Sequence, residues 1–205
     1  MKKIIVATII AIMLCVSFNL NVYAEGIKED TYTVEEMYKY EAKEDGTIKI
    51  TGVTEKFFEY YDGATILELP DEINGMEVTS ILTRLNKIDT LKEIKLPKSM
   101  KVIGSHLFED CVNLEKVTLP DNITLINEKA FYNCSNLKTI EMPESVIQIE
   151  DLAFAECRSL KKIELPANVK RLGENVFQNC TGLEEIKINN KLTVIKDNTF
   201  IGCTS

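Results

Sequence analysis

Cysteine recurs at intervals of 23 residues through the second half of the chain, and a phenylalanine precedes each cysteine by three residues. The cysteines are Cys111, Cys134, Cys157, Cys180 and Cys203, and the phenylalanines are Phe108, Phe131, Phe154, Phe177 and Phe200. A strict period of this length is typical of a solenoid, in which each repeat stacks on the next. The chain divides into five equal rows that begin at Leu91, Leu114, Leu137, Leu160 and Leu183. The sequence therefore predicts one elongated repeat domain.

Each row opens with Leu-x-x-Ile-x-Leu-Pro or a close variant, as in residues 114–120, which predicts a short β-strand that the proline ends. A second apolar pair follows, and then an acidic residue or serine and a short apolar pair such as Ala130-Phe131, which together predict a single helical turn. The acidic or serine column is Ser105, Glu128, Asp151, Glu174 and Asp197. Helix capping explains this column better than a calcium ladder, because no row supplies several close oxygen ligands.

The repeated cysteines occupy one register between buried apolar positions, where a thiol serves as a small apolar side chain. Parallel side chains on stacked rows would hold their Cβ atoms too far apart for disulfides. Each row also lacks a second layer to cover its own apolar residues, so we expect neighbouring rows to cover them.

The N-terminus has the order of a secretory signal peptide, with Lys2 and Lys3, an apolar stretch over 4–18 and a small residue at Ala24. We expect removal of residues 1–24, which leaves 22 basic and 32 acidic residues and a formal charge of −10. That charge disfavours a nucleic-acid partner. The apolar stretch is too short for a comfortable membrane span, so no stable span is expected after cleavage.

The rows resemble the BspA-type leucine-rich repeats of bacterial surface and secreted proteins. The resemblance is strongest at residues 137–157, which carry Leu137, Ile140, Met142, Pro143, Val146, Ile149, Ala153, Phe154 and Cys157 at the motif positions. It implies an α/β leucine-rich-repeat solenoid of short parallel strands and short helical turns, and a surface protein of the kind implicated in adhesion.

Upstream of the regular rows the pattern is weaker. Residues 64–90 resemble a degenerate row lengthened around Asn74-Gly75, in which Leu85 replaces the phenylalanine and Ile88 the cysteine. Alternating apolar residues on both sides of 43–46 predict a β-hairpin that covers the first rung. We therefore divide the chain into a signal peptide (1–24), an N-terminal cap (25–63) and a leucine-rich-repeat domain (64–205, with regular rows over 91–205). Row five ends in phase without a divergent cap, which leaves open either a continuing gene or a truncated array.

The outward strand positions form two columns on one surface, hereafter the strand face, and solenoids commonly use such a surface for binding. One column is Glu93, Lys116, Thr139, Lys162 and Glu185, and the other is Lys95, Thr118, Glu141, Glu164 and Lys187. Neither contains an aromatic anchor, which favours weak or multivalent contacts with a protein or glycan of a host or neighbouring cell. The competing interpretation is a solvated face whose opposite charges pair between strands.

Catalysis has little support in the sequence. The single histidine, His106, falls at a variable position, the cysteines lack a base, and neither a phosphate-binding loop nor a metal-ligand spacing is present. We therefore expect a non-enzymatic, monomeric binding protein without a cofactor or metal. The alternatives are a structural spacer within a larger envelope protein, and a hydrolase whose catalytic part lies outside this chain.

Overall fold

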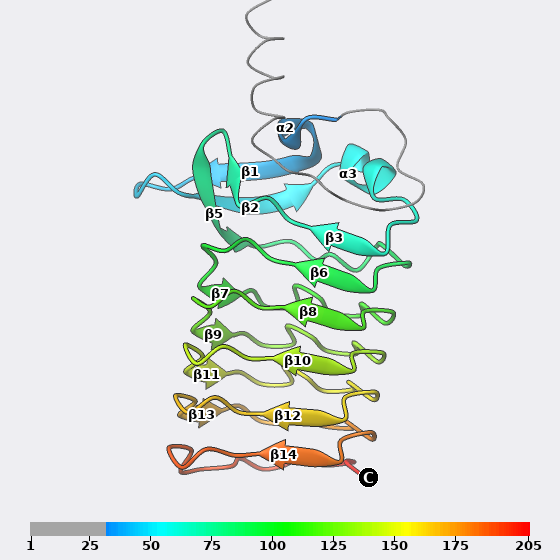
Figure 1. The fold of residues 1–205 in the computed structure, drawn as a ribbon, viewed down its shortest axis with the longest axis vertical. Helices are drawn as coiled ribbons and strands as arrows, with labels where there is room; N and C mark the ends of the chain where they lie inside the picture. The colour runs from blue at the N-terminus through cyan, green and yellow to red at the C-terminus, as the bar shows by residue number, and fades with distance from the viewer. Residues whose placement is uncertain (1–31) are drawn as a thin grey trace, which may run out of the picture.

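The computed structural model describes residues 32–205, which form a short cap and a stack of rows (Figure 1). The expected signal peptide over 1–24 lies outside the described residues. The cap consists of α2 (Val34–Met37), β1 (Tyr38–Ala42), β2 (Ile48–Val53) and α3 (Glu55–Tyr60). The degenerate row contains β3 (Ile66–Glu68), β4 (Glu72–Ile73) and β5 (Met76–Ile81). No helix within this described part is long and apolar enough to cross a membrane.

Each regular row contributes one strand to the strand face, and rows one to four add a second strand on another side of the solenoid (Figure 1). The first strands are β6 (Glu93–Lys95), β8 (Lys116–Thr118), β10 (Thr139–Glu141), β12 (Lys162–Glu164) and β14 (Glu185–Lys187). The second strands are β7 (Val102–Ile103), β9 (Leu125–Ile126), β11 (Gln148–Ile149) and β13 (Arg171–Leu172). All pairs among these strands are parallel, in the orders β3-β6-β8-β10, β12-β14 and β7-β9-β11-β13. The predicted solenoid of 23-residue rows is confirmed.

The predicted hairpin is β1 and β2, which pair antiparallel with Ala42 opposite Ile48. β2 then pairs with β5 in parallel, and β5 pairs with β4 across a tight turn at Asn74 and Gly75, whose φ angles are 54° and 73°. Two successive positive φ angles are typical of a type I′ turn. Residues 64–90 therefore contribute β4 and β5 to the sheet of the cap and β3 to the sheet of the first strands. The domain boundary at residue 64 stays a prediction.

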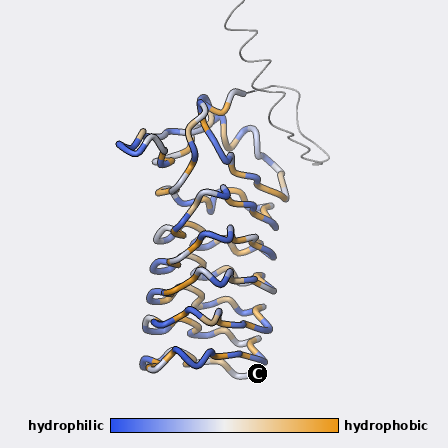
Figure 2. Tube along the Cα trace, turned by 60° about the vertical axis from the view of Figure 1, so that its left-hand side comes forward, coloured by the Kyte–Doolittle hydropathy of each residue, from blue (hydrophilic) through white to orange (hydrophobic). Residues whose placement is uncertain are grey.

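The core is one continuous apolar cluster, to which each row contributes apolar residues (Figure 2). At its centre Phe131 stacks on Phe154 with ring centroids 5.1 Å apart and planes 5° apart, and Phe154 stacks on Phe177 at 5.7 Å. Phe108 and Phe200 extend the ladder in both directions. Because each ring stacks on its equivalents in adjacent rows, contacts between rows contribute much of the stability.

The cysteine column lies beside this ladder. Cys134 Sγ donates to the carbonyl of Phe108 at 3.2 Å, and Cys157 Sγ donates to the carbonyl of Phe131 at 3.2 Å. Cys111 Sγ lies 3.7 Å from the carbonyl of Leu85, the residue that replaces the phenylalanine in the degenerate row. Each thiol is therefore a packed side chain that also provides a weak hydrogen bond between rows.

The segment expected to form a helical turn differs from the prediction. It consists of successive tight turns, and α2 and α3 in the cap are the only helices within residues 32–205. Two columns interrupt the right-handed helical conformation because their φ angles are positive: His106, Lys129, Leu152, Asn175 and Asn198, and Asp110, Asn133, Glu156, Asn179 and Gly202. The acidic column therefore does not cap helices. Asp151 Oδ1 instead accepts the N–H of Glu174, its counterpart in the next row, at 2.7 Å.

Row five carries only the first strand, β14. Its Ile195 is 48% exposed, whereas the equivalent residues Ile126 and Ile149 of inner rows are fully buried. Part of the apolar surface of this row is therefore uncovered.

Candidate functional site

The ten predicted strand-face residues lie on the five first strands, in the two columns that their spacing predicts. All are exposed except Glu93, which is half-buried. The residues between them, such as Val117 and Ile163, point into the core and are nearly inaccessible to solvent. The structure thus brings the ten side chains together on one side of the stack, and their role in binding stays a prediction.

Most charges on the strand face pair between adjacent rows. In the first column Lys116 lies 3.6 Å from Glu93, and Lys162 lies 3.2 Å from Glu185. In the second column the pair is Lys187 with Glu164, at 3.2 Å. Exposed ion pairs of this kind contribute only about 0–1 kcal/mol each. Their main effect is to cancel charge locally, so the face presents little net charge to a ligand.

The second column extends onto the degenerate row, where Lys95 lies 3.4 Å from Glu68. A further column, which the sequence analysis did not single out, borders the face and pairs in the same way. In it Glu115 contacts Lys92 at 3.6 Å and also Lys138. Among the charged residues of the two predicted columns, Glu141 alone makes no ion pair within the described residues.

A groove of about 670 Å³, hereafter the cap groove, lies where the cap meets the carboxyl ends of β3 and β6. Tyr60 and Tyr61 line it from the α3 side, and Lys95 and Thr118 line it from the strand face. Its volume is in the range of ligand sites. Sequence reasoning missed this groove because the tyrosines belong to the cap, and only the folded chain places them beside the strand ends.

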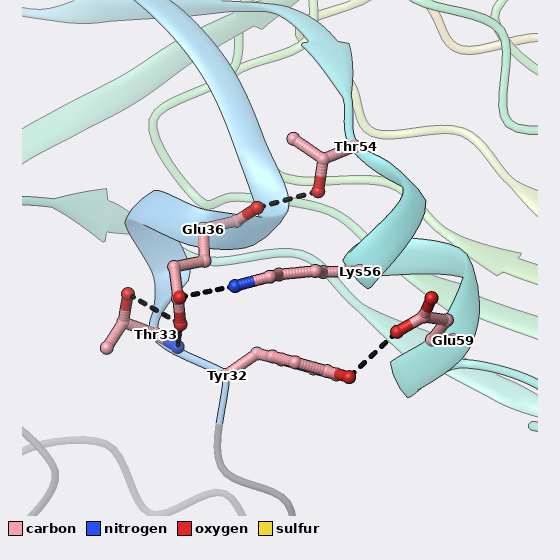
Figure 3. Close-up of polar contacts among 6 residues, drawn as sticks. All are labelled: Tyr32, Thr33, Glu36, Thr54, Lys56 and Glu59. Carbon is pink, nitrogen blue, oxygen red and sulfur yellow. Dashed lines mark hydrogen bonds and ion pairs between the residues drawn. The ribbon is translucent and has the colours of Figure 1, made fainter.

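The two helices that frame the cap groove are held together by polar contacts (Figure 3). The Glu36 carboxylate accepts the Thr33 N–H at 3.0 Å and contacts the Lys56 ammonium at 2.5 Å. The hydroxyl of Thr54 donates to the carbonyl of Glu36 at 2.6 Å. Lys56 also lowers the pKa of Glu36, so this clasp persists below neutral pH. It ties α2 to α3 and thereby positions the tyrosines at the end of α3.

Tyr38 and Tyr61 form the buried wall of the cap groove. The Tyr61 hydroxyl donates to the carbonyl of Glu68 at 3.3 Å, which attaches the cap to the end of β3. The Tyr38 hydroxyl is fully buried, and the Tyr61 hydroxyl interacts with it. Burial raises the pKa of both phenols, so both remain protonated donors at physiological pH.

A second groove of about 660 Å³, hereafter the row groove, lies at the carboxyl ends of β10, β12 and β14. Its apolar side chains include Met142, Leu165 and Ile188. Seven of the ten predicted residues line one of the two grooves: Lys95, Thr118, Thr139, Glu141, Lys162, Glu164 and Lys187. The remaining three, Glu93, Lys116 and Glu185, line neither.

The groups considered for catalysis lie apart from these grooves. His106 Nδ1 lies 3.1 Å from Glu109 Oε2, and the same oxygen contacts Arg84 at 2.6 Å, so this histidine belongs to a small ionic cluster. Burial raises the pKa of the Cys111 and Cys180 thiols to about 12, which keeps them protonated and unreactive at neutral pH. Within the described part of the chain, no three His, Cys, Asp or Glu side chains cluster as metal ligands.

Comparison with known sequences agrees with this architecture. The profile of the BspA type leucine-rich repeat region matches residues 79–205 in six copies. The matched region begins within the degenerate row, which spans residues 64–90. No curated protein matches the chain.

Comparison with solved structures identifies bacterial leucine-rich repeat proteins. A leucine-rich repeat protein of T. pallidum is 28% identical with a TM-score of 0.71, over 84% of this chain and 78% of that one. One from Bacteroides ovatus is 27% identical with a TM-score of 0.71, over 85% and 45%. A leucine-rich cell surface protein of Faecalibacterium prausnitzii is 26% identical with a TM-score of 0.70, over 83% and 46%. This chain therefore spans less than half the length of the last two.

Proposed function

This chain belongs to the BspA-type leucine-rich repeat family, and from that premise we propose that it is an exported, non-enzymatic protein that binds a macromolecule on a cell surface through its strand face. The observation that carries this proposal is the position of the two grooves. Both lie at the carboxyl ends of the first strands. Together they include seven of the ten residues that their spacing predicts on the strand face. A protein or glycan of a host or neighbouring cell is the proposed partner.

Export is supported by the basic, apolar and small-residue order of residues 1–24. It is also supported by the description of the Faecalibacterium prausnitzii relative as a cell surface protein. If the signal is cleaved as proposed, mass spectrometry of the exported protein will find an N-terminus at Glu25. An intact Met1 on the exported protein would contradict the cleavage.

The binding face is tested by reversing four of its charges together, as Lys116→Glu, Glu141→Lys, Lys162→Glu and Glu164→Lys. Beads that carry the mature chain are applied to a panel of epithelial and bacterial cells, and attachment is counted. We expect attachment to fall with the fold intact, because these side chains lie outside the core. Because the face is nearly neutral, we also expect only a modest loss of attachment as salt rises.

The matched control reverses Lys101→Glu, Glu128→Lys, Lys170→Glu and Asp197→Lys, which are exposed residues off the strand face and leave the net charge unchanged. His106, Lys129 and Asn175 are unsuitable controls, since their positive φ angles make substitutions there change backbone strain. Loss of attachment in the control alone would place the binding surface elsewhere. Unchanged attachment in both variants would favour a structural spacer. The paired charges of the strand face are also compatible with that function.

A further inference from the structure

The hairpin of β4 and β5 turns at Asn74-Gly75, which is the only Asn-Gly sequence in the chain. Ile73 and Met76 pair on either side of it, so the turn consists of these two residues alone. Both residues of the turn are exposed to solvent. An asparagine side-chain amide is attacked most readily by the backbone nitrogen of a following glycine, because glycine has no Cβ to hinder the approach. The turn is therefore a candidate for spontaneous covalent modification.

The backbone nitrogen of Gly75 is free to react. In a two-residue turn the backbone hydrogen bond joins the flanking residues, here Ile73 and Met76. The Gly75 N–H itself makes no hydrogen bond within residues 32–205. A Cβ placed on Gly75 would have no atom within 4 Å, so no neighbouring segment packs over the turn. Water and a moving Asn74 side chain therefore both have room beside this nitrogen.

The Asn74 side chain is held at a single point. Its Nδ2 donates to the Tyr40 hydroxyl at 2.7 Å, which is its one side-chain hydrogen bond within the described residues. The strand before it, β4, has only two residues, Glu72 and Ile73. The end of so short a hairpin opens locally at little cost, because few contacts are lost. Such opening lets Asn74 rotate about ψ and brings its Cγ to the Gly75 nitrogen.

Asparagines at the turns of the regular rows are protected by comparison. Asn133 Nδ2 donates to Asp110 Oδ1 at 2.9 Å, and the N–H of the next residue, Cys134, donates to the carbonyl of Phe131 at 3.2 Å. Asn179 has the same two kinds of contact. In both cases the nitrogen that would attack is already hydrogen-bonded, and it belongs to a residue with a buried side chain. These two asparagines therefore serve as internal controls.

We propose that Asn74 is a site of spontaneous deamidation that loosens the cap, with water as the only co-reactant. The Gly75 nitrogen attacks Cγ of Asn74, and a new C–N bond closes a five-membered succinimide. The side-chain nitrogen leaves as ammonia and takes the proton that the Gly75 nitrogen loses. Water then adds to one of the two ring carbonyls and opens the ring, which gives aspartate or isoaspartate at residue 74. Nothing is oxidised or reduced, and the inference does not depend on what the strand face binds.

The modification acts on the cap through charge and through backbone length. Glu72 and Glu77 already lie opposite each other across the hairpin, and like charges in that position disfavour strand pairing. A carboxylate at residue 74 adds a third negative charge. Isoaspartate also inserts one extra carbon into the backbone of a two-residue turn, which the paired strands cannot accommodate. Because Glu72 lines the cap groove and β5 pairs with β2, deamidation loosens this border of the groove as the protein ages.

The test incubates the folded mature chain at body temperature and mildly alkaline pH for several weeks and follows every asparagine by peptide mass spectrometry. Fragmentation by electron transfer distinguishes isoaspartate from aspartate. We expect both products at Asn74, formed faster than at Asn133 and Asn179 by about tenfold or more, because glycine leaves its nitrogen unhindered. Hydrogen exchange of residues 76–78 is measured on the same samples, and we expect it to become faster as isoaspartate accumulates.

Two variants separate the chemistry from its effect on the cap. Asn74→Gly keeps a turn that accepts two positive φ angles and cannot deamidate, so its exchange at residues 76–78 should not change during the incubation. Asn74→Asp carries the aspartate product from the start and should show faster exchange there before any incubation. An Asn74 that keeps its amide, or that reacts no faster than Asn133, would overturn the assignment of the site. Unchanged exchange in a fully modified sample would overturn the effect on the cap.

Discussion

Replacing Phe154 by alanine tests the packing of the rows most directly. Its ring is completely buried and lies between the rings of Phe131 and Phe177, at 5.1 and 5.7 Å. Truncation of a buried phenylalanine to alanine costs about 3–5 kcal/mol. Because Phe154→Ala removes a stacked partner from both neighbours and leaves a cavity between closely packed rows, we expect a loss near the upper end, about 4–5 kcal/mol.

Phe200→Ala is the matched comparison, since Phe200 is only partly buried and stacks on Phe177 alone at 5.7 Å. We expect it to cost at most about half as much. The assay is urea unfolding followed by far-UV circular dichroism, since the chain has no tryptophan. Hydrogen exchange should show weaker protection in rows two and four of Phe154→Ala. Equal costs for the two variants would refute the argument that stability comes from contacts between rows.

Three other predictions concern the thiols and the backbone. In the folded protein we expect Cys134, Cys157 and Cys180 to resist a thiol reagent and the half-buried Cys203 to react first. Denaturation without reductant should expose five free thiols per mature chain, and a count of three or one would reveal disulfides. Burial raises the pKa of Cys111 and Cys180 from 9.0 to about 12, so unfolding releases protons from these thiols between pH 9 and pH 12. The free energy of unfolding should therefore fall as pH rises over that range. A constant urea midpoint from pH 9 to pH 12 would contradict the burial of these thiols. Lys129 has a φ of 54°, so Lys129→Asn should raise stability by about 0.5–1 kcal/mol, and a lower melting temperature would argue against strain at this position.

Much of the fold was predictable because each row repeats the same local pattern. The spacing of Leu114, Val117 and Leu119 predicted which strand positions are buried, and the structure confirms all three. The hairpin was predictable from alternation on both sides of residues 43–46. The left-handed turn columns were missed, although the asparagines at Asn133 and Asn179 were a usable signal, because asparagine tolerates positive φ more readily than other residues.

The candidate site was only half predictable. Period-two alternation placed Thr118 and Glu141 on the outer face, but it could not show that grooves form at the ends of their strands. The pairing of Lys187 with Glu164 needed the parallel register, which the 23-residue period supplies. The tyrosines that line the cap groove could not be inferred, because the cap lies outside the repeat and its packing on the strand ends has no counterpart in the periodic pattern.

The repeat pattern was enough to predict the solenoid, its row register and its buried columns. Each row contacts mainly its neighbours, so a periodic pattern specifies those contacts. How the cap meets the rows, and where the cap groove forms, became visible only in the folded chain. Those features depend on contacts between segments of different pattern, such as Tyr61 with Glu68. Such contacts are determined by side-chain packing in three dimensions, which the repeat period does not encode.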